Sequence, residues 1–451
     1  MYGLRNLLGI AAGRLTAQTM RLLGRQSTAL PGYVTERFTS HALRDIAGER
    51  KYAAKILVTG TNGKTTTTLL VKMMLEAAGY EVVNNMSGSN LTRGVLTTLL
   101  TDKRQGQKTV LLLEVDEASM PAVSEATQPT CIAILNLFRD QLDRYGEVDT
   151  TRQLLSQSIV AAPSAELILN ADDPHVAALA VNRSNPVQYF GLNLPQLTAL
   201  AHDHASDVPL SPTTGAPLEY SQRYFGHIGQ YAATDKSFQR PKPALQVTSL
   251  HHTADKHTEI SFTLQKKQHK VTTRLQGVYS VYNVSAATLI AHNFGITLSD
   301  IAIALQRKQT AFGRQETVEY RDIAMQFFLI KNPTGFNQVI QAHFQQKQPH
   351  PVLIIINDNF ADGRDVSWLW DAAIEDAQFG DRLIVSGSRA YDMALRLEYA
   401  GISCTVIDEP QAALEEAVRL ASKGQVYVLP TYTALLDLRK YLTLKLEHTR
   451  E

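Results

Sequence analysis

The chain has little of what marks an extracellular or membrane-embedded protein. Its 451 residues include 2 cysteines, Cys131 and Cys404, far apart and each in an apolar stretch. Two such cysteines argue against a disulfide framework and are typical of small buried side chains in a reducing cytoplasm. No apolar run approaches the roughly 20 residues that a transmembrane helix needs. We therefore expect a cytoplasmic protein.

Neither sign of charge is in excess. The sequence has 44 basic and 43 acidic residues, a formal net charge of +1, which argues against wholesale binding of nucleic acid. Its hydrophobic content of 44% is ordinary for a globular protein, and its length predicts two or three domains.

The first 35 residues are the exception, because they contain no acidic side chain. Four arginines precede Glu36, the first acidic residue, and they are Arg5, Arg14, Arg21 and Arg25. Four leucines at helical spacing would line one face of a helix, next to the face that carries the arginines. They are Leu4, Leu8, Leu15 and Leu22. Three interpretations stay open: a helix packed on the next domain, an organelle transit peptide, or a basic helix resting on anionic lipid at the inner face of the membrane.

A glycine-rich loop carries the strongest functional signal. It follows the apolar run Ile56–Val58, precedes a helical pattern, and reads Thr59-Gly60-Thr61-Asn62-Gly63-Lys64-Thr65-Thr66. Glycines let the backbone fold around an anion, and a helix N-terminus presents its N–H groups to it. Lys64 can reach the terminal phosphates of a nucleotide, and the Thr65 hydroxyl can hold Mg²⁺. The sequence therefore predicts an ATP site.

Polar residues at the ends of later strands complete this prediction. Glu114 ends one strand and, with Glu117 as the alternative, could bind Mg²⁺. Asn136 follows the next strand, in the segment Asn136–Gly146. Parallel strands bring such residues to one edge of a sheet.

The loop, in its shortened form T-G-T-N-G-K-T-T, resembles that of the Mur ligase superfamily. Residues 136–146 resemble its N-x-x-x-D-H-L-D-R-x-G segment, but Gln141 replaces the histidine, which puts a second Mg²⁺ in doubt. The resemblance implies nucleotide contacts along the loop and beyond it, from Gly60, Thr61, Asn62, Gly63, Lys64, Thr65, Thr66, Asn136, Asn170, Asp172, Asp173, Asn283 and Arg314.

Segments in the second half are more specific and resemble the MurT family, the synthetase subunits of lipid II isoglutaminyl synthase. They are residues 331–338, 357–371 and 429–435. The resemblance implies ATP-dependent amidation of the α-carboxyl of D-glutamate in lipid II, catalysed with Lys64 and Glu114. It also implies that ammonia comes from a separate GatD-type glutamine amidotransferase. An aspartate of this chain would complete the catalytic Cys-His pair of that partner. We favour Asp365 over Asp362, because Asp-Gly is a common turn dipeptide.

MurT proteins commonly hold zinc in a four-cysteine ribbon, and this sequence departs from that pattern. The corresponding positions are Ser211, Thr214, Ala233 and Lys236. Thiolate coordination is impossible there, so we expect no zinc and a ribbon that persists by packing.

Alternating short strands and helices predict an α/β fold. We expect a basic helical segment at 1–50, a mostly parallel ATP-binding domain at 51–315 with an inserted lobe at about 196–256, and a smaller α/β domain at 316–451. Two rival functions remain: a ligase that adds an amino acid, as folylpolyglutamate synthetase does, and a non-catalytic ATP-binding scaffold.

Overall fold

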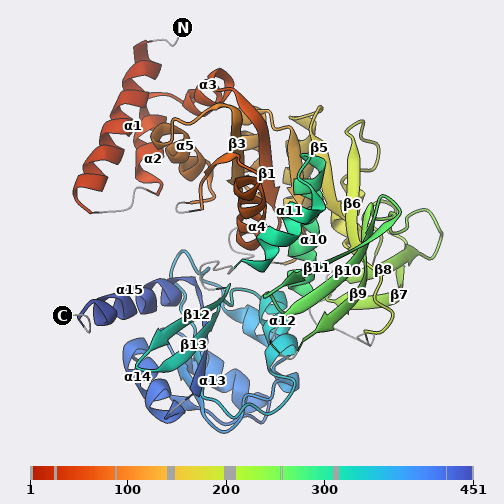
Figure 1. Ribbon diagram of the computed structural model, residues 1–451. Helices are drawn as coiled ribbons and strands as arrows, with labels where there is room; N and C mark the ends of the chain where they lie inside the picture. The colour runs from red at the N-terminus through yellow and green to blue at the C-terminus, as the bar shows by residue number, and fades with distance from the viewer. Residues whose placement is uncertain are drawn as a thin grey trace.

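Helices cover both faces of two separate β-sheets (Figure 1). The computed structural model describes residues 4–24, 28–86, 89–139, 148–197, 210–253, 255, 257–307, 314–422 and 424–448. Within these ranges the strands form a nine-stranded sheet, a six-stranded sheet and a two-stranded hairpin. This is the α/β class that the sequence predicts.

The larger sheet has the order β11-β10-β9-β6-β5-β4-β1-β3-β2. Neighbours from β9 to β2 are parallel, whereas β9, β10 and β11 pair antiparallel. Its strands are β1 (Tyr52–Thr59), β2 (Glu81–Asn84), β3 (Gly106–Glu114), β4 (Cys131–Ile134), β5 (Glu166–Asn170), β6 (Val187–Leu192), β9 (Leu245–His252), β10 (Thr258–Leu264) and β11 (Lys267–Thr273).

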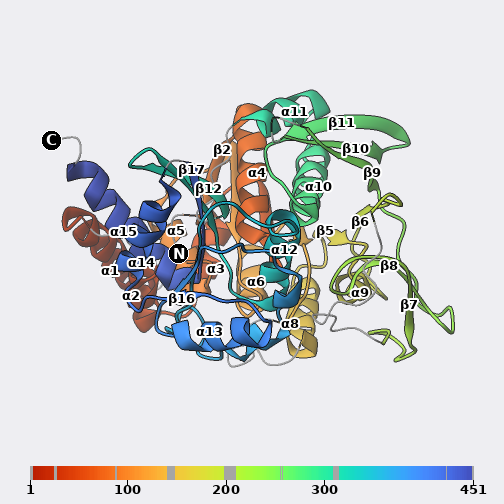
Figure 2. The ribbon, with the colours of Figure 1, turned by 90° about the horizontal axis from the view of Figure 1, so that it is seen from below.

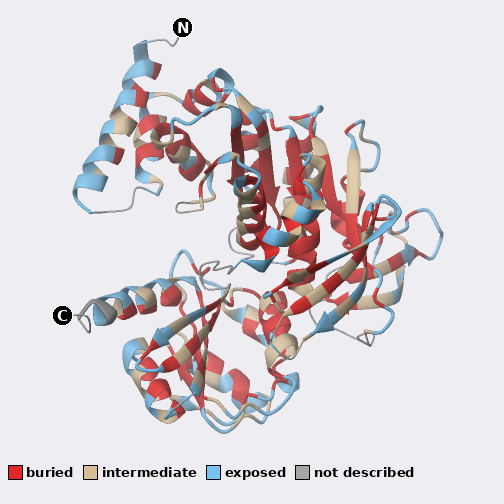
Figure 3. Ribbon diagram, viewed as in Figure 1, coloured by how far each residue is buried: buried red, intermediate tan, exposed pale blue. Residues whose placement is uncertain are grey.

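Side-chain alternation along β1 divides the interior into two cores. Ile56 and Val58 face one core, and Leu57 faces the other. The buried positions in Figure 3 follow this sheet on both sides. Its helices are α4 (Lys64–Ala77), α5 (Thr92–Thr101), α6 (Met120–Thr127), α8 (Val148–Val160), α9 (Pro174–Ala178), α10 (Val278–Asn293) and α11 (Leu298–Gln306).

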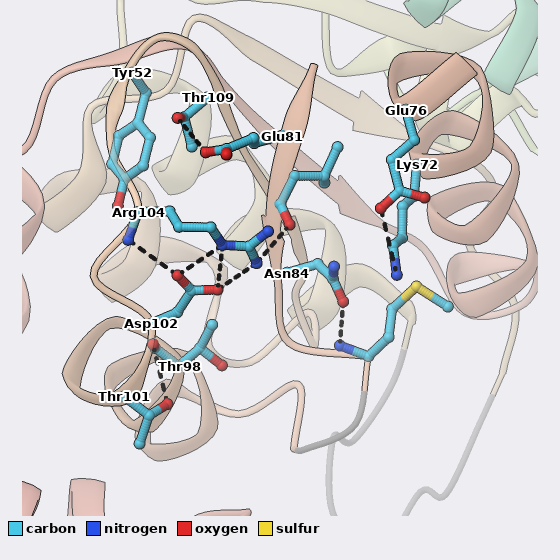
Figure 4. A network of polar contacts seen from close by, with 12 residues as sticks. Tyr52, Lys72, Glu76, Glu81, Asn84, Thr98, Thr101, Asp102, Arg104 and Thr109 are labelled. Atoms are coloured by element: carbon cyan, nitrogen blue, oxygen red, sulfur yellow. Dashed lines mark hydrogen bonds and ion pairs between the residues drawn. The ribbon is translucent and has the colours of Figure 1, made fainter. Parts of the chain in front are cut away.

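An ion pair between Arg104 and Asp102 stabilises the edge of this sheet (Figure 4). The Arg104 guanidinium donates to the Asp102 carboxylate and, at 3.1 Å, to the carbonyl of Val82 in the edge strand β2. Burial alone would raise the pKa of Asp102, but the hydrogen bonds from Arg104 lower it below its usual value. Arg104 therefore anchors the last strand to the loop that follows α5.

The predicted lobe contains a two-stranded hairpin, β7 (Leu218–Phe225) and β8 (Ile228–Ala233). Its packing rests on aromatic rings, with Tyr231 stacked on Phe238 at 5.6 Å between ring centroids. Thr214, one of the four positions that the sequence analysis compared with zinc-binding cysteines, accepts through Oγ1 a hydrogen bond of 3.1 Å from Ser237. Residues 245–252 fall within the range predicted for the lobe, but they form β9 of the nine-stranded sheet.

Three N-terminal helices, α1 (Leu4–Leu22), α2 (Leu30–Phe38) and α3 (Ala42–Glu49), lie on one side of this sheet (Figure 1). Helix α1 packs through Gly9, Ile10, Gly13 and Ala17. Its leucines point away from the protein. No helix in the described part of the chain is both long and apolar enough to cross a membrane.

The smaller sheet has the order β12-β13-β17-β14-β15-β16. Only β12 runs antiparallel to its neighbour, and it begins before residue 316, the predicted start of this domain. The strands are β12 (Arg314–Tyr320), β13 (Ile323–Phe328), β14 (Val352–Ile355), β15 (Leu383–Ser386), β16 (Thr405–Val406) and β17 (Gly424–Pro430). The helices are α12 (Pro333–His343), η1 (Ser367–Asp371), η2 (Ile374–Asp376), α13 (Ala390–Tyr399), α14 (Pro410–Ala421) and α15 (Tyr432–His448).

A buried histidine pair joins the hairpin to the larger sheet. His227 Nε2 lies 3.5 Å from a carboxylate oxygen of Asp173, and the His175 ring stands edge-on to the His227 ring at 5.7 Å. Burial, followed by the neighbouring His227, lowers the pKa of His175 to about 4. His175 is therefore neutral in the folded protein at pH 7.

This pair predicts acid sensitivity of the fold. Because the pKa of His175 falls from 6.5 to about 4 on folding, the unfolded chain binds an extra proton between these values. Stability should decrease as the pH falls through this window, by up to about 3 kcal/mol. Urea unfolding at several pH values measures it, and His175→Phe should flatten the dependence, whereas the exposed control His251→Phe should not. An equally steep pH dependence in His175→Phe would contradict this assignment.

Candidate active site

The predicted phosphate-binding loop, residues 59–66 and called the phosphate loop below, joins β1 to α4 and depends on two glycines with positive φ. Gly60 has φ of 129° and Gly63 has φ of 89°, a region that disfavours other residues. A Cβ atom on Gly63 would lie 2.1 Å from Asn283 Oδ1. The loop thus allows Asn283, from the distant helix α10, to approach the start of α4.

Asn136 holds this loop in shape. Its side-chain Oδ1 accepts a hydrogen bond of 2.8 Å from the Asn62 N–H, and its Nδ2 donates to the Asn62 carbonyl at 3.0 Å. Thr61 adds a second pair of hydrogen bonds, with the N–H and the carbonyl of Phe138. Since Asn136 and Phe138 follow β4, the neighbour of β1, the parallel sheet brings both segments to one edge.

Lys64 points into the loop and pairs with Glu117. Its Nζ donates to the Gly60 carbonyl at 2.7 Å and lies 3.1 Å from both carboxylate oxygens of Glu117. Glu114 lies at the end of β3, where its carboxylate accepts a hydrogen bond of 3.3 Å from Asn90. The two candidate carboxylates thus differ, because Glu117 faces the lysine and Glu114 faces a neutral amide.

The start of α4 suits an anion. Gly63 occupies the N-cap position, and no side chain of the described residues caps this helix. Helix N-termini carry N–H groups without intrahelical partners and a partial positive charge. Thr65 lies in the first turn and is half-buried, whereas Thr66 is buried and lines the adjoining cleft.

A cleft that is partly open to solvent extends from the loop. Asn62, Gly63 and Thr66 line one end. The other walls carry amides and aromatic rings, from Asn136, Phe138, Asn170, Phe225, Tyr282, Asn283 and Phe328. Flat apolar walls with a few amide groups fit a nucleobase. The aromatic residues belong to no motif, so they could not be identified as site residues from the sequence.

Helix α12 closes the cleft from the second sheet, beside α10 (Figure 2). Lys331, Thr334 and Gly335 contribute to its lining. Asn332 Nδ2 donates to Asn62 Oδ1 at 3.2 Å, while Asn332 Oδ1 caps α12 by accepting from the Gly335 N–H at 2.8 Å. One side chain therefore joins the phosphate loop to the second sheet, a contact that sequence spacing alone could not reveal.

Asn170 lines the cleft, but the two aspartates that follow it do not. Asp172 accepts from the Leu192 N–H at 2.7 Å and from the Tyr282 hydroxyl at 2.6 Å, and it pairs with Arg240. Asp173 caps α9, and its other oxygen accepts from the Leu137 N–H at 2.8 Å. Both side chains are fully buried, so in this structure they support the walls of the site.

Two other predicted positions are not described. Gln141 lies outside the described residues. Arg314 begins β12, but its side chain lies outside the described set. Among the described residues, no cluster of three or more His, Cys, Asp or Glu side chains has a metal-binding arrangement.

Asp362 and Asp365 lie in one loop but have different surroundings. Asp362 is buried, and its carboxylate accepts from both the N–H and the hydroxyl of Thr433. Burial raises the pKa of Asp362, although these hydrogen bonds act to lower it. Asp365 is exposed, and hydrogen bonds from Ser367 lower its pKa. Asp362 therefore fixes the loop to the start of α15, whereas Asp365 is accessible.

Tyr432, next to Thr433, connects this loop electrostatically with the phosphate site. Burial raises the pKa of Tyr432 most, followed by the nearby charges of Glu114 and Asp362. Tyr432 thus lies within reach of the charges of both carboxylates. Tyr432 and Thr433 fall inside the segment 429–435, but the sequence pattern indicates no separate role for either residue.

Comparisons with known proteins agree with this geometry. The Mur ligase middle domain family matches residues 58–227, and the MurT ligase C-terminal family matches residues 329–435. A pseudomurein peptide ligase type C from Methanothermus fervidus has the same fold, with a TM-score of 0.69 and 20% identity over 90% of this chain and 81% of that one.

Two curated relatives carry the same name, lipid II isoglutaminyl synthase (glutamine-hydrolyzing) subunit MurT. The one from Staphylococcus aureus (strain N315) is 28% identical over 98% of this chain and 99% of its own length. The one from Streptococcus pneumoniae (strain ATCC BAA-255 / R6) is 33% identical over 97% of both chains. Near-complete coverage at this identity means that the protein belongs to the MurT family of Mur ligase-like enzymes.

Proposed function

We propose that this chain is the synthetase subunit of a lipid II isoglutaminyl synthase. It uses ATP to amidate the α-carboxyl group of D-glutamate in the stem peptide of lipid II, with ammonia from a glutamine-hydrolysing partner of the GatD type. The observation that carries this proposal is the cleft between the two sheets, which joins a phosphate loop to a segment matched by the MurT C-terminal family.

The reaction needs two steps, because a carboxylate is a poor acceptor for ammonia. In the first, the bond between the γ-phosphorus of ATP and the ADP oxygen breaks, and a carboxylate oxygen of the substrate bonds to phosphorus. In the second, ammonia attacks the acyl carbon, the phosphate leaves with that oxygen, and the nitrogen loses a proton. The enzyme must stabilise the negative charge that develops on the transferred phosphoryl group.

The chain's own groups suit the first step. The amides and rings of the cleft would hold the base, and the N–H groups at the start of α4 would hold the phosphates. Lys64 would exchange its contact with Glu117 for the terminal phosphate. Thr65 and Glu114 offer the oxygen ligands that Mg²⁺ prefers, with Glu117 as the alternative carboxylate. When bound, Mg²⁺ would neutralise phosphate charge.

The ammonia requires another chain. Glutamine hydrolysis of this type needs an activated cysteine, and the chain has 2 cysteines. Cys131 is buried in β4, and burial raises its pKa; burial also raises the pKa of Cys404. Neither is a reactive thiolate. The exposed Asp365 is the aspartate that we assign to the partner's catalytic group.

An aromatic patch that includes Trp370, from the short helix that follows Asp365, suits the partner. Exposed side chains on α13 recur at helical spacing, and Trp370 from η1 adjoins them, with its ring 5.3 Å from the Tyr399 ring. The aromatic patch consists of Trp370, Tyr391, Leu395 and Tyr399. Tyrosine and tryptophan are enriched at protein interfaces, where they supply large contact areas. We infer that the amidotransferase docks on this patch.

Replacement of Lys64 tests the nucleotide site. Lys64→Ala should reduce amidation of lipid II by at least about a hundredfold, because the lysine would balance phosphate charge. The control Lys72→Ala removes a partly exposed lysine from the same helix and should retain activity. Mass spectrometry of lipid II measures both variants. A near-normal rate in a folded Lys64→Ala protein would remove the assignment of the ATP site.

Replacement of Asp365 separates the two ammonia sources. Asp365→Asn should impair glutamine-driven amidation of lipid II but spare the ammonium-driven reaction. Asp381→Asn, at an exposed position elsewhere, is the matched control and should change neither rate. If both reactions of Asp365→Asn match the wild type, this aspartate does not serve the partner.

Replacing one residue of the aromatic patch tests whether the amidotransferase docks there. Tyr399→Ser should weaken the complex with the amidotransferase by about tenfold or more, while the rate with ammonium stays the same. Isothermal titration calorimetry measures the affinity. An unchanged dissociation constant would show that the partner docks elsewhere.

A further inference from the structure

Helix α1 exposes its leucines to solvent. Five of them are at least half exposed, namely Leu4, Leu7, Leu8, Leu15 and Leu22. Leu4, Leu8, Leu15 and Leu22 recur at intervals of four and seven residues, which places them on one face of the helix. A continuous apolar face of this kind on a protein surface indicates an interaction site.

The opposite face of α1 cannot accept these leucines. A Cβ atom on Gly13 would lie 2.0 Å from Thr35 Oγ1, and one on Gly9 would lie 2.9 Å from Phe38 Cβ. Helix α1 therefore approaches α2 more closely than any larger side chain allows. The small residues fix the rotation of the helix, and the leucines are held outward.

The charge around this face is positive. Arg5 and Arg21 are exposed on α1, and no acidic residue occurs before Glu36. Two acidic groups of the neighbouring helices are already engaged, since Glu36 pairs with Arg93 and the Asp45 carboxylate accepts a hydrogen bond from Asn6. Leucines flanked by arginines, on a helix that itself carries no acidic residue, suit a surface that is both apolar and anionic.

We propose that α1 docks this protein on an anionic membrane surface, lying in the plane of the bilayer with its leucines among the lipid chains. Helices of this composition bind at the interface by combining apolar burial with attraction to anionic headgroups. The inference rests on the proposed function, because a lipid-linked substrate is reached at the membrane. Helices α1 and α15 lie on the same side of the molecule in Figures 1 and 2.

Flotation of the full-length protein with lipid vesicles tests the proposal. Vesicles of phosphatidylglycerol and phosphatidylcholine should bind it, vesicles of phosphatidylcholine alone should bind it far less, and high salt should release it. The double variant Leu8→Gln/Leu15→Gln should bind the anionic vesicles about tenfold more weakly or worse. The control Ile303→Gln, at an equally exposed position on α11, should bind as the wild type does. Circular dichroism checks that both variants are folded.

Two outcomes would overturn the proposal. In the first, the wild type does not bind anionic vesicles. In the second, the leucine variant binds them as the wild type does. If the leucine variant then also loses self-association, measured by light scattering, or its affinity for the amidotransferase, the face is a protein interface.

Activity measurements keep this proposal separate from the proposed function. With lipid II in detergent micelles, the leucine variant should match the wild type; with lipid II in vesicles, it should be slower. Failure of the wild type to amidate lipid II in micelles would refute the proposed function. Vesicle binding, which is measured without substrate, would still test the docking of α1.

Discussion

The site depends on the paired hydrogen bonds between Asn136 and the backbone of Asn62. A single neutral hydrogen bond contributes only about 1 kcal/mol to stability. Here two of them, 2.8 and 3.0 Å long, fix the turn whose N–H groups we propose bind phosphate. They form because β1 and β4 are adjacent parallel strands that end at the same edge of the sheet. The geometry of the loop thus follows from the topology of the sheet.

The same loop links the two halves of the molecule. Its Asn62 side chain accepts from Asn332 at the start of α12, and Lys64, two residues later, faces Glu117. A nucleotide in the cleft would contact both the loop and α12, so binding and the relative position of the two sheets should be coupled. On the C-terminal side, Thr433 holds Asp362 and thereby leaves Asp365 exposed in the same loop.

Much of this arrangement could be predicted from the sequence, because it depends on local patterns. The strand, glycine turn and helix around Gly63, and the alignment of the leucines on one face of α1, follow from spacing and backbone chemistry, whereas the exposure of that face comes from the structure. Contacts between distant segments could not be predicted in this way. Nothing in the sequence near Tyr282 indicates that its ring lines the cleft, and the neighbours of Asp172 and Asp173 come from other strands and from α10. Their burial gives both aspartates a supporting role that the motif did not reveal.

The central claim is that the carboxylate of the substrate is activated as an acyl phosphate. The most direct test uses lipid II whose D-glutamate α-carboxylate carries heavy oxygen, incubated with this protein, ATP, Mg²⁺ and ammonium. The account predicts that one heavy oxygen appears in the inorganic phosphate for every amide formed, because the phosphate leaves with a carboxylate oxygen. Amide formation with unlabelled phosphate would contradict it, since the carboxylate would then have been activated by another route.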